Sequence, residues 1–130
     1  MNNKYFAKII AKDSQGLQLI SVCCSRAKLR VSELRYLKRN QIFLIFLERF
    51  NVENKNNNEK INSVCKFEFV ESVKSKKIDQ NDKDLTLELL AIDLIKNKDR
   101  FEINLIFNNN SFITLSTEII EVTLEDQNKI

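Results

Sequence analysis

The longest uninterrupted apolar run of the chain lies in residues Ile42–Phe50, where six apolar side chains precede Glu48. Successive side chains of a β-strand point to opposite faces of its sheet. Both faces of this segment are therefore apolar, which is typical of a strand that is covered on both sides. We predict a central strand here and expect neighbouring segments to pair with it.

Shorter segments alternate apolar and polar residues, which is the pattern of a strand with one buried face. These segments are Lys28–Val31, Cys65–Phe69, Phe101–Phe107 and Phe112–Ser116. The alternation slips at Val70, which indicates a bulge or a bend. Two further strands are expected at Tyr5–Ala11 and, after a kink at Thr117-Glu118, at Ile119–Leu124.

One short helix is predicted from Ser14 to about Ser25, because apolar side chains recur there at helical spacing. Those side chains are Leu17, Ile20 and Cys24. An oxygen of Asp13 or of Ser14 can cap the first turn by accepting from free amide groups. Gly16 in that turn carries a small cost in helix stability.

The segment Leu85–Ile95 is open to two interpretations. Its leucines share one strand face up to Leu89, and the phase then shifts at Leu90, which indicates a bulged strand. A helix is the alternative, since Leu, Glu and Ala favour it and the length suits it.

Polar turns separate these elements, and Asn and Lys occupy them because the chain has no proline and one glycine. The expected turns and loops are Arg35–Gln41, Asn51–Lys60, Asp79–Asp84, Lys96–Arg100 and Asn108–Asn110. Asn tolerates the left-handed backbone of tight turns better than most residues. The first of these turns joins the Lys28–Val31 strand to Ile42–Phe50, so we expect an antiparallel pair. The last residues, Glu125–Ile130, are expected to fray.

Together these patterns predict one α+β domain spanning residues 1–130. We expect a mainly antiparallel β sheet of six or seven strands, open or split-barrel-like, with one short N-terminal helix.

Composition fits a soluble globular protein, with 43% hydrophobic and 30% charged residues. No apolar run approaches the roughly 18 residues of a membrane span. The N-terminal residues Met1–Tyr5 lack the apolar core of a secretory signal. We therefore expect a cytoplasmic protein with no membrane association. In that reducing compartment Cys23, Cys24 and Cys65 should be free, buried thiols.

The chain has no histidine, which excludes Ser-His-Asp and Cys-His nucleophiles and His-ligated metals. A single glycine cannot build a phosphate-binding glycine loop. No cysteine spacing suits a metal, so no cofactor is predicted. An enzyme would have to use a cysteine or a carboxylate.

A basic set is the candidate binding face, for phosphates or nucleic acid, despite a net charge of only +3. Its members are Lys28, Arg30, Arg35, Lys38, Arg39, Lys74, Lys76 and Lys77. The alternative is a solvated edge strand that lysine and arginine protect from aggregation. Only Tyr36 lies among these charges, whereas binders of single-stranded nucleic acid offer several stacking rings.

The carboxylates of residues 79–93 are the candidate acid–base or cation site. They are Asp79, Asp82, Asp84, Glu88 and Asp93. The run from Asp79 to Asp84 lacks the central glycine and the closing glutamate of a calcium loop. A polar turn between strands explains it better.

Three segment groups resemble a family of small bacterial proteins described only as a domain of unknown function. They are Ala7–Asp13 with Leu17–Ser21, Val73–Asp79 with Leu89–Ile92, and the hairpin of Ile103–Phe107 and Ile113–Leu115 with Ile119–Asp126. The resemblance covers nearly the whole chain, but it departs from the family where glycines would be expected at Asn108–Asn110 and a tryptophan near Val52. It implies one complete domain and brings no catalytic residues.

We therefore favour a non-enzymatic binding or protein-interaction domain, whose partner is another protein or a second copy of the chain. RNA or other nucleic-acid binding through the Lys28–Arg39 face is one alternative. A histidine-free enzyme that uses Cys or Asp is the other.

Overall fold

The computed structural model describes residues 7–50 and 59–127. Within these ranges ten strands form one sheet, and one α-helix accompanies it. The strands are β1 (Lys8–Ala11), β2 (Ala27–Arg30), β3 (Leu34–Leu37), β4 (Ile42–Phe50), β5 (Lys60–Phe67), β6 (Val70–Lys76), β7 (Thr86–Asn97), β8 (Arg100–Phe107), β9 (Phe112–Thr117) and β10 (Val122–Asp126). The helix is α1 (Ser14–Cys23), and two 3-10 turns, η1 (Val31–Glu33) and η2 (Lys38–Asn40), flank β3. The α+β class and the single N-terminal helix are as predicted.

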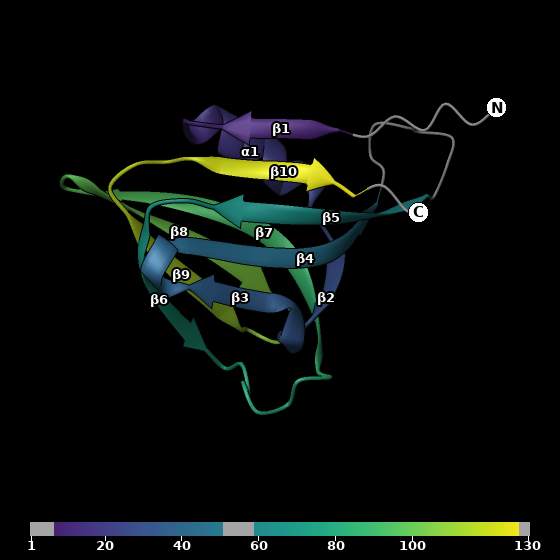
Figure 1. Cartoon of the computed structure of the whole chain (residues 1–130). Coiled ribbons are helices and arrows are strands. Elements are labelled where there is room, and N and C mark those ends of the chain that lie inside the picture. The colour runs from purple at the N-terminus through teal and green to yellow at the C-terminus, as the bar shows by residue number, and fades with distance from the viewer. Residues whose placement is uncertain (1–6, 51–58, 128–130) are drawn as a thin grey trace.

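The sheet is open and entirely antiparallel, with the order β1-β10-β5-β4-β2-β7-β8-β9-β6, and β3 also pairs with β4. It curls into two layers (Figure 1). Strands β10, β5, β4 and β3 form the near layer in that view, and β7, β8 and β9 lie behind them. The bend lies at β2, which pairs with both β4 and β7.

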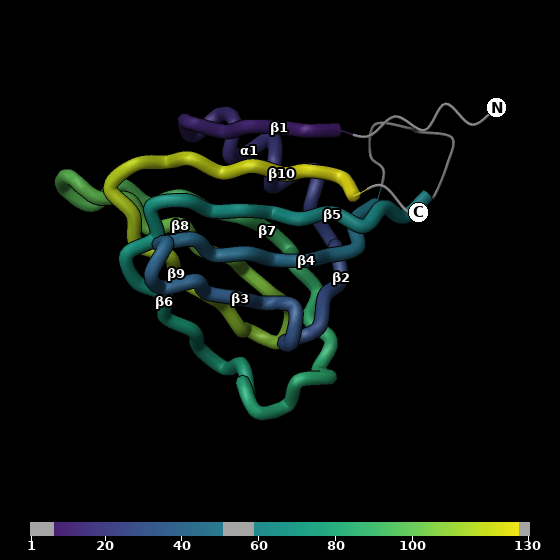
Figure 2. Tube along the Cα trace, viewed as in Figure 1, coloured from purple at the N-terminus to yellow at the C-terminus, as the bar shows by residue number. Residues whose placement is uncertain are grey.

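The core fills the space between the two layers, because each strand turns its alternate apolar side chains inward. The largest fully buried apolar side chains come from both layers and from α1: Phe67, Phe107, Leu17, Ile20, Ile45, Leu89, Ile103, Leu105, Leu115 and Leu124. The N- and C-terminal strands β1 and β10 lie side by side, as the chain trace shows (Figure 2).

The prediction of a strand at Ile42–Phe50 is confirmed, but the prediction that both its faces are covered is wrong. One face is buried, through Phe43, Ile45 and Leu47, whereas alternate residues on the other face are only half-buried. Among the described elements, no second layer packs on the outer face. Instead, the guanidinium of Arg35 lies 5.5 Å from the ring centre of Phe46 and partly shields it.

The predicted number of strands, six or seven, is also wrong. Part of the predicted turn Arg35–Gln41 is strand, because Leu34–Leu37 pairs with Ile42–Ile45. The strand predicted at Cys65–Phe69 begins earlier, at Lys60, and ends at Phe67. Phe69 adopts a left-handed backbone with φ 59° and is 42% exposed, so it does not share the buried face of Phe67. The bend expected at Val70 is confirmed, since a separate strand, β6, begins at this residue.

Helix α1 begins where predicted and ends two residues earlier than predicted. Asp13 caps it by accepting the amide of Gly16 at 2.8 Å. The helix contacts β1 and β7, and the hydroxyl of Ser21 accepts the amide of Ile92 in β7 at 2.9 Å. It therefore covers the opening between the first strand and the far layer.

The ambiguous segment Leu85–Ile95 is a strand, and a register shift between Leu89 and Ala91 confirms the predicted bulge. The turns predicted at 79–84 and at Asn108–Asn110 are confirmed, with left-handed backbones at Asn109 and Asn110. The turn predicted at Lys96–Arg100 is shorter than predicted: only Lys98 and Asp99 form it, because Lys96 and Asn97 belong to β7 and Arg100 begins β8. Of the loop predicted at 51–60, residues 51–58 lie outside the described ranges, and Lys60 belongs to β5.

The expectation of a frayed C-terminal end is wrong for its first residues. Glu125 and Asp126 belong to β10, and the side chain of Asp126 is buried. The polar character of the sequence there concealed a buried ion pair, described below.

Candidate functional site

A groove of about 300 Å³ separates the edge strands β3 and β6. Leu34 and Tyr36 of β3 line one side, and Val73 and Ser75 of β6 line the other. The floor is apolar and comes from Val31, Phe43 and Ile113. Pockets of this size and apolar character are the usual binding sites of small domains.

The two strands are joined at one end of the groove. The amide of Val70 donates to the carbonyl of Gln41 at 2.8 Å, and the Tyr36 hydroxyl donates to the carbonyl of Val70 at 2.8 Å. From this junction β3 and β6 diverge (Figure 1). In the described part of the chain, β3 pairs only with β4 and β6 only with β9, so one edge of each strand faces the groove.

The segment 77–85 bounds the wide end of the groove. Ser32 donates its amide to the carbonyl of Lys83 at 3.1 Å, and the amide nitrogen of the Gln80 side chain donates to the hydroxyl of Ser75 at 2.8 Å. Gln80, Lys83 and Ile78 therefore stand at the mouth of the groove. A ligand would pass one lysine and polar groups at the entrance and would contact apolar walls inside the groove.

The structure distributes the predicted basic set over two regions. Arg35 on β3 and Lys74 and Lys76 on β6 are exposed and alternate with the groove-lining residues of the same strands. Lys38 and Arg39 belong to η2, near the joined end, and Lys77 follows β6 with φ 60°. In the part of the chain described, none of the eight has an acidic side chain within ion-pair distance.

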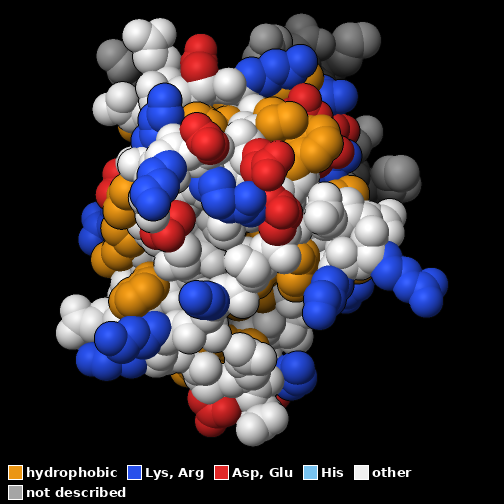
Figure 3. All heavy atoms as spheres, turned by 90° about the vertical axis from the view of Figure 1, so that its left-hand side faces the viewer, with side chains coloured by type: hydrophobic (Ala, Val, Ile, Leu, Met, Phe, Trp, Pro, Cys, Tyr) orange, Lys and Arg blue, Asp and Glu red, His pale blue; other side chains and the backbone are white. Residues whose placement is uncertain are grey.

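Lys28 and Arg30 stand apart from the groove. They line a different open hollow on the outer face of the sheet, beside Glu33 and Glu48. Figure 3 shows the side of the molecule that contains β6: acidic and basic side chains intermix over its middle, and Lys and Arg predominate towards the lower end. The predicted face is therefore not continuous, and six of its eight members surround the groove or its joined end.

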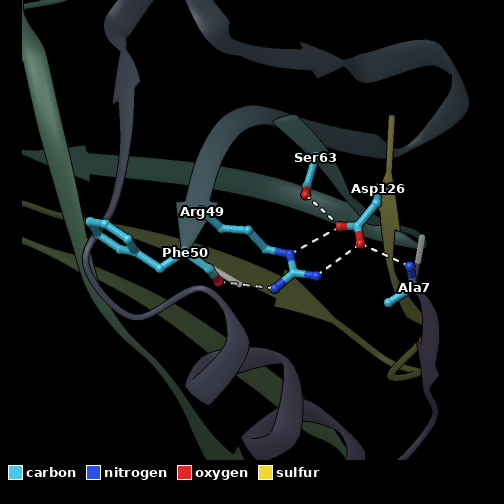
Figure 4. Close-up of polar contacts among 5 residues, drawn as sticks. All are labelled: Ala7, Arg49, Phe50, Ser63 and Asp126. Carbon is cyan, nitrogen blue, oxygen red and sulfur yellow. Dashed lines mark hydrogen bonds and ion pairs between the residues drawn. The ribbon is translucent and has the colours of Figure 1, made fainter. Parts of the chain in front are cut away.

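The structure contains a buried ion pair that the sequence did not predict. Nε and Nη2 of Arg49 donate to the two carboxylate oxygens of Asp126 at 3.0 and 2.9 Å, and both side chains are fully buried (Figure 4). Ser63 donates its hydroxyl to Asp126 at 2.7 Å, the amide of Ala7 donates to it at 2.8 Å, and Arg49 also donates to the carbonyl of Phe50 at 3.1 Å.

The charges of this pair balance each other. Burial alone would raise the pKa of Asp126, but the hydrogen bonds from Arg49, Ser63 and the Ala7 amide outweigh it and hold that pKa below its ordinary value. Asp126 therefore stays ionised at neutral pH. Its oxygens are occupied by four donors and lie away from solvent, so the arrangement ties β4, β5, β10 and the residue before β1 together and has no open position for a substrate.

A pair of carboxyl groups lies on the outer surface of the sheet. Glu68 and Glu121 line a shallow hollow together with Lys12 and Lys66. A hydrogen bond with Glu121, followed by partial burial, raises the pKa of Glu68 above its ordinary value. The pair is partly neutralised, since Lys12 lies 3.9 Å from Glu121.

The three cysteines are free and buried, as predicted. A hydrogen bond with Cys24 and burial raise the pKa of the Cys65 thiol well above its ordinary value. A protonated, buried thiol is a poor nucleophile.

The carboxylate of Asp79 stabilises the 79–84 turn itself. An oxygen of Asp79 accepts the amide of Asn81 at 3.0 Å, and the amide of Asp82 donates to the carbonyl of Asp79 at 3.2 Å. Glu88 lies 3.5 Å from Arg26 in an ion pair. Among the described residues no three His, Cys, Asp or Glu side chains come together as metal ligands. No described helix has the length and apolar character that crossing a bilayer requires.

Comparison with known proteins gives one family. The family model for "Protein of unknown function (DUF2948)" matches residues 7–130, so the chain belongs to that family, and the resemblance of its sequence to a domain of unknown function is confirmed. No curated protein and no solved structure matches the chain.

Proposed function

We propose that this member of the DUF2948 family is a non-enzymatic binding domain, which receives a partner in the groove between β3 and β6. The observation that carries the proposal is the groove itself: the sheet stays unpaired between two edge strands, over a floor of apolar side chains. Tyr36, Val73 and Leu34 keep part of their apolar surface accessible there. Exposed apolar surface between unpaired strands is the feature of a docking site.

Charge supports the same location. Arg35, Lys74 and Lys76 flank the groove without acidic partners among the described side chains. Exposed charges of this kind cost little folding free energy when they have no partner, and they attract an acidic partner that approaches. The partner that fits best is apolar on one side and acidic on the other.

A peptide-display selection on the purified protein tests this proposal. We expect enriched peptides whose binding is lost in Ser75→Trp, because the indole fills the groove from β6. Ser72→Trp is the matched control: Ser72 is an exposed serine of the same strand, three residues away, whose side chain points to the other face. If no peptide is enriched, or if Ser75→Trp binds the enriched peptides as well as the wild type does, the proposal is wrong.

The nucleic-acid alternative would use the same basic side chains. Its support is weaker, because two of the rings beside them already carry a cation: Arg35 lies 5.5 Å from the ring centre of Phe46, and Lys76 lies 5.9 Å from that of Phe112. Bases need open ring faces on which to stack. A fluorescent oligouridine titration at low and high salt tests this alternative, and tight, salt-sensitive binding that Lys74→Glu abolishes would favour it over a protein partner.

A further inference from the structure

The longer free edge beside the groove belongs to β6. It has seven residues, against four in β3, and beyond its junction at Val70 its groove-side edge pairs with no described strand. An unpaired strand edge presents backbone N–H and C=O groups that an extended peptide can pair with. The groove thus offers backbone pairing in addition to apolar contact.

The side chains on either side of that edge alternate in character. Val73 and Ser75 point into the groove, and Lys74 and Lys76 point outward. On β3 the order is the same, with Leu34 and Tyr36 inward and Arg35 outward. A strand laid between them would have one face over apolar residues and the other beside three positive charges, because strand side chains alternate with period two.

We propose that the occupant of the groove is an extended segment of an acidic protein, in which apolar and acidic residues alternate, and that it adds to the free edge of β6. Its apolar side chains contact Leu34, Phe43 and Val73, and its carboxylates lie beside Arg35, Lys74 and Lys76. This proposal rests on the proposed function and names the partner class and the binding mode of that same groove.

The outward lysines also oppose pairing of the open edge with a second copy of β6. Two β6 edges would bring Lys74 and Lys76 of each copy together, and like charges on facing strands oppose pairing. An acidic strand removes that repulsion. The same side chains that protect the edge from self-association therefore select its partner.

The probe is a fluorescein-labelled, terminally capped peptide, Glu-Val-Glu-Ile-Glu-Val-Glu, measured by fluorescence anisotropy. Two derivatives carry N-methyl groups on alternate residues, one on the odd set and one on the even set. Because only one set of N–H groups of an added strand faces β6, we expect one derivative to bind about tenfold more weakly than the other. Equal binding by both derivatives and the parent would overturn strand addition and leave groove binding standing.

Charge reversal provides the second readout. Lys74→Glu should weaken binding of the parent peptide by about threefold to tenfold, as expected for the loss and reversal of an exposed charge contact. Lys96→Glu, an exposed lysine on β7 away from the groove, is the control and should change little. An equal effect of both variants would show that only net charge matters and would overturn the contact.

The remaining outcomes separate the two proposals. If display selection yields groove-dependent peptides but the acidic probe does not bind, the partner class is wrong and the binding groove stands. If neither binds, the proposed function fails as well. Self-association that Ser75→Trp abolishes and Ser72→Trp preserves would assign the groove to a second copy of the chain and overturn the peptide proposal.

Discussion

The ion pair of Arg49 and Asp126 shows how much one buried contact can control. Removing two charges from water is costly, and the cost is offset only when each charge keeps its partner and its hydrogen bonds. Here the guanidinium meets the carboxylate through two donors, and Ser63 and Ala7 satisfy the remaining oxygen positions. The pair therefore adds little net stability by itself, but losing one partner is expensive.

Arg49→Met should consequently destabilise the protein by about 3–5 kcal/mol, because it leaves the Asp126 carboxylate buried without its countercharge. Urea unfolding followed by circular dichroism measures this as a lower midpoint with an unchanged slope. The matched control is Arg100→Met. Arg100 pairs with Glu71 and Glu118 at the surface, and exposed pairs contribute about 0–1 kcal/mol. Similar losses in both variants would contradict the argument.

The same pair predicts how stability depends on pH. The folded-state pKa of Asp126 lies below its ordinary value, so its contribution is fully present above the unfolded pKa of about 3.9 and is lost as pH falls through the folded pKa. We expect the wild type to lose stability below about pH 4. Asp126→Asn should be less stable at pH 7, and its deficit should shrink as pH falls from 5 to 2. A constant deficit over that range would refute this assignment.

Arg49 could have been placed in the core from the sequence, whereas its partner could not. Strand period two puts Arg49 on the face of Phe43, Ile45 and Leu47, but a charged residue near a strand end is usually read as exposed. Asp126 lies 77 positions away in the sequence. Its position is set by the pairing of β10 with β5, which no local pattern encodes.

Helix α1 illustrates a constraint at the scale of an element. Gly16 lowers intrinsic helix stability, and the fold explains why it is there: a Cβ at this position would lie 3.0 Å from both Cα and Cβ of Ala11 in β1. The helix crosses the strand at the distance that glycine allows. Local propensity and packing thus have opposite preferences at this position.

Gly16→Ala should therefore destabilise the protein, although the same change in an exposed helix gains about 0.5–1 kcal/mol. Thermal unfolding measures the change in Tm. Gln18→Ala, on the exposed side of the same helix, is the control and should stay within about 0.5 kcal/mol of the wild type. A rise in Tm for Gly16→Ala would show that the contact with Ala11 relaxes without cost.

Most elements could be predicted because their patterns are long. The twelve-residue β7 shows its bulge in the leucine phase, and the Asn108–Asn110 turn shows its left-handed residues in its composition. Short elements were harder. The four residues of β3 contain one aromatic, two leucines and one arginine, too few to define a period, and they form a strand because β4 lies beside them.

At the scale of the whole molecule, the sequence indicated an open or split sheet, but it did not show where the split lies. The basic residues were expected to share one face, with Arg35 in a turn, and the structure places Arg35 on β3 and Lys74 and Lys76 on β6, on opposite sides of one groove. That placement depends on the antiparallel pairing of β6 with β9, a strand of the far layer. Such long-range pairing follows from the joint packing of the core and not from any one segment.

The groove between β3 and β6 also divides the sheet into parts of unequal stability. The pairs β4–β5 and β7–β8 extend over eight residues each and are flanked by further strands. In the part of the chain that the structure describes, β6 has neighbours only at β9 and at the joined end. Edge strands with one partner open more readily than central ones. We therefore expect the amides of β6 to exchange with solvent faster than those of β4 and β7.

Tyr36→Phe tests whether the hydrogen bond at the joined end of the groove holds β6 in place beside β3. The change removes the hydroxyl that donates to the Val70 carbonyl and keeps the ring that packs 6.5 Å from Phe43. Loss of one such hydrogen bond costs about 1 kcal/mol. If opening is local, hydrogen exchange should become about fivefold faster in β6 and stay unchanged in β7 and β8. Tyr36→Leu, which also removes the ring, should accelerate exchange in β4 as well. Uniform acceleration across all strands in Tyr36→Phe would show instead that β6 opens only when the whole sheet unfolds, and the groove would then be a rigid feature of the fold.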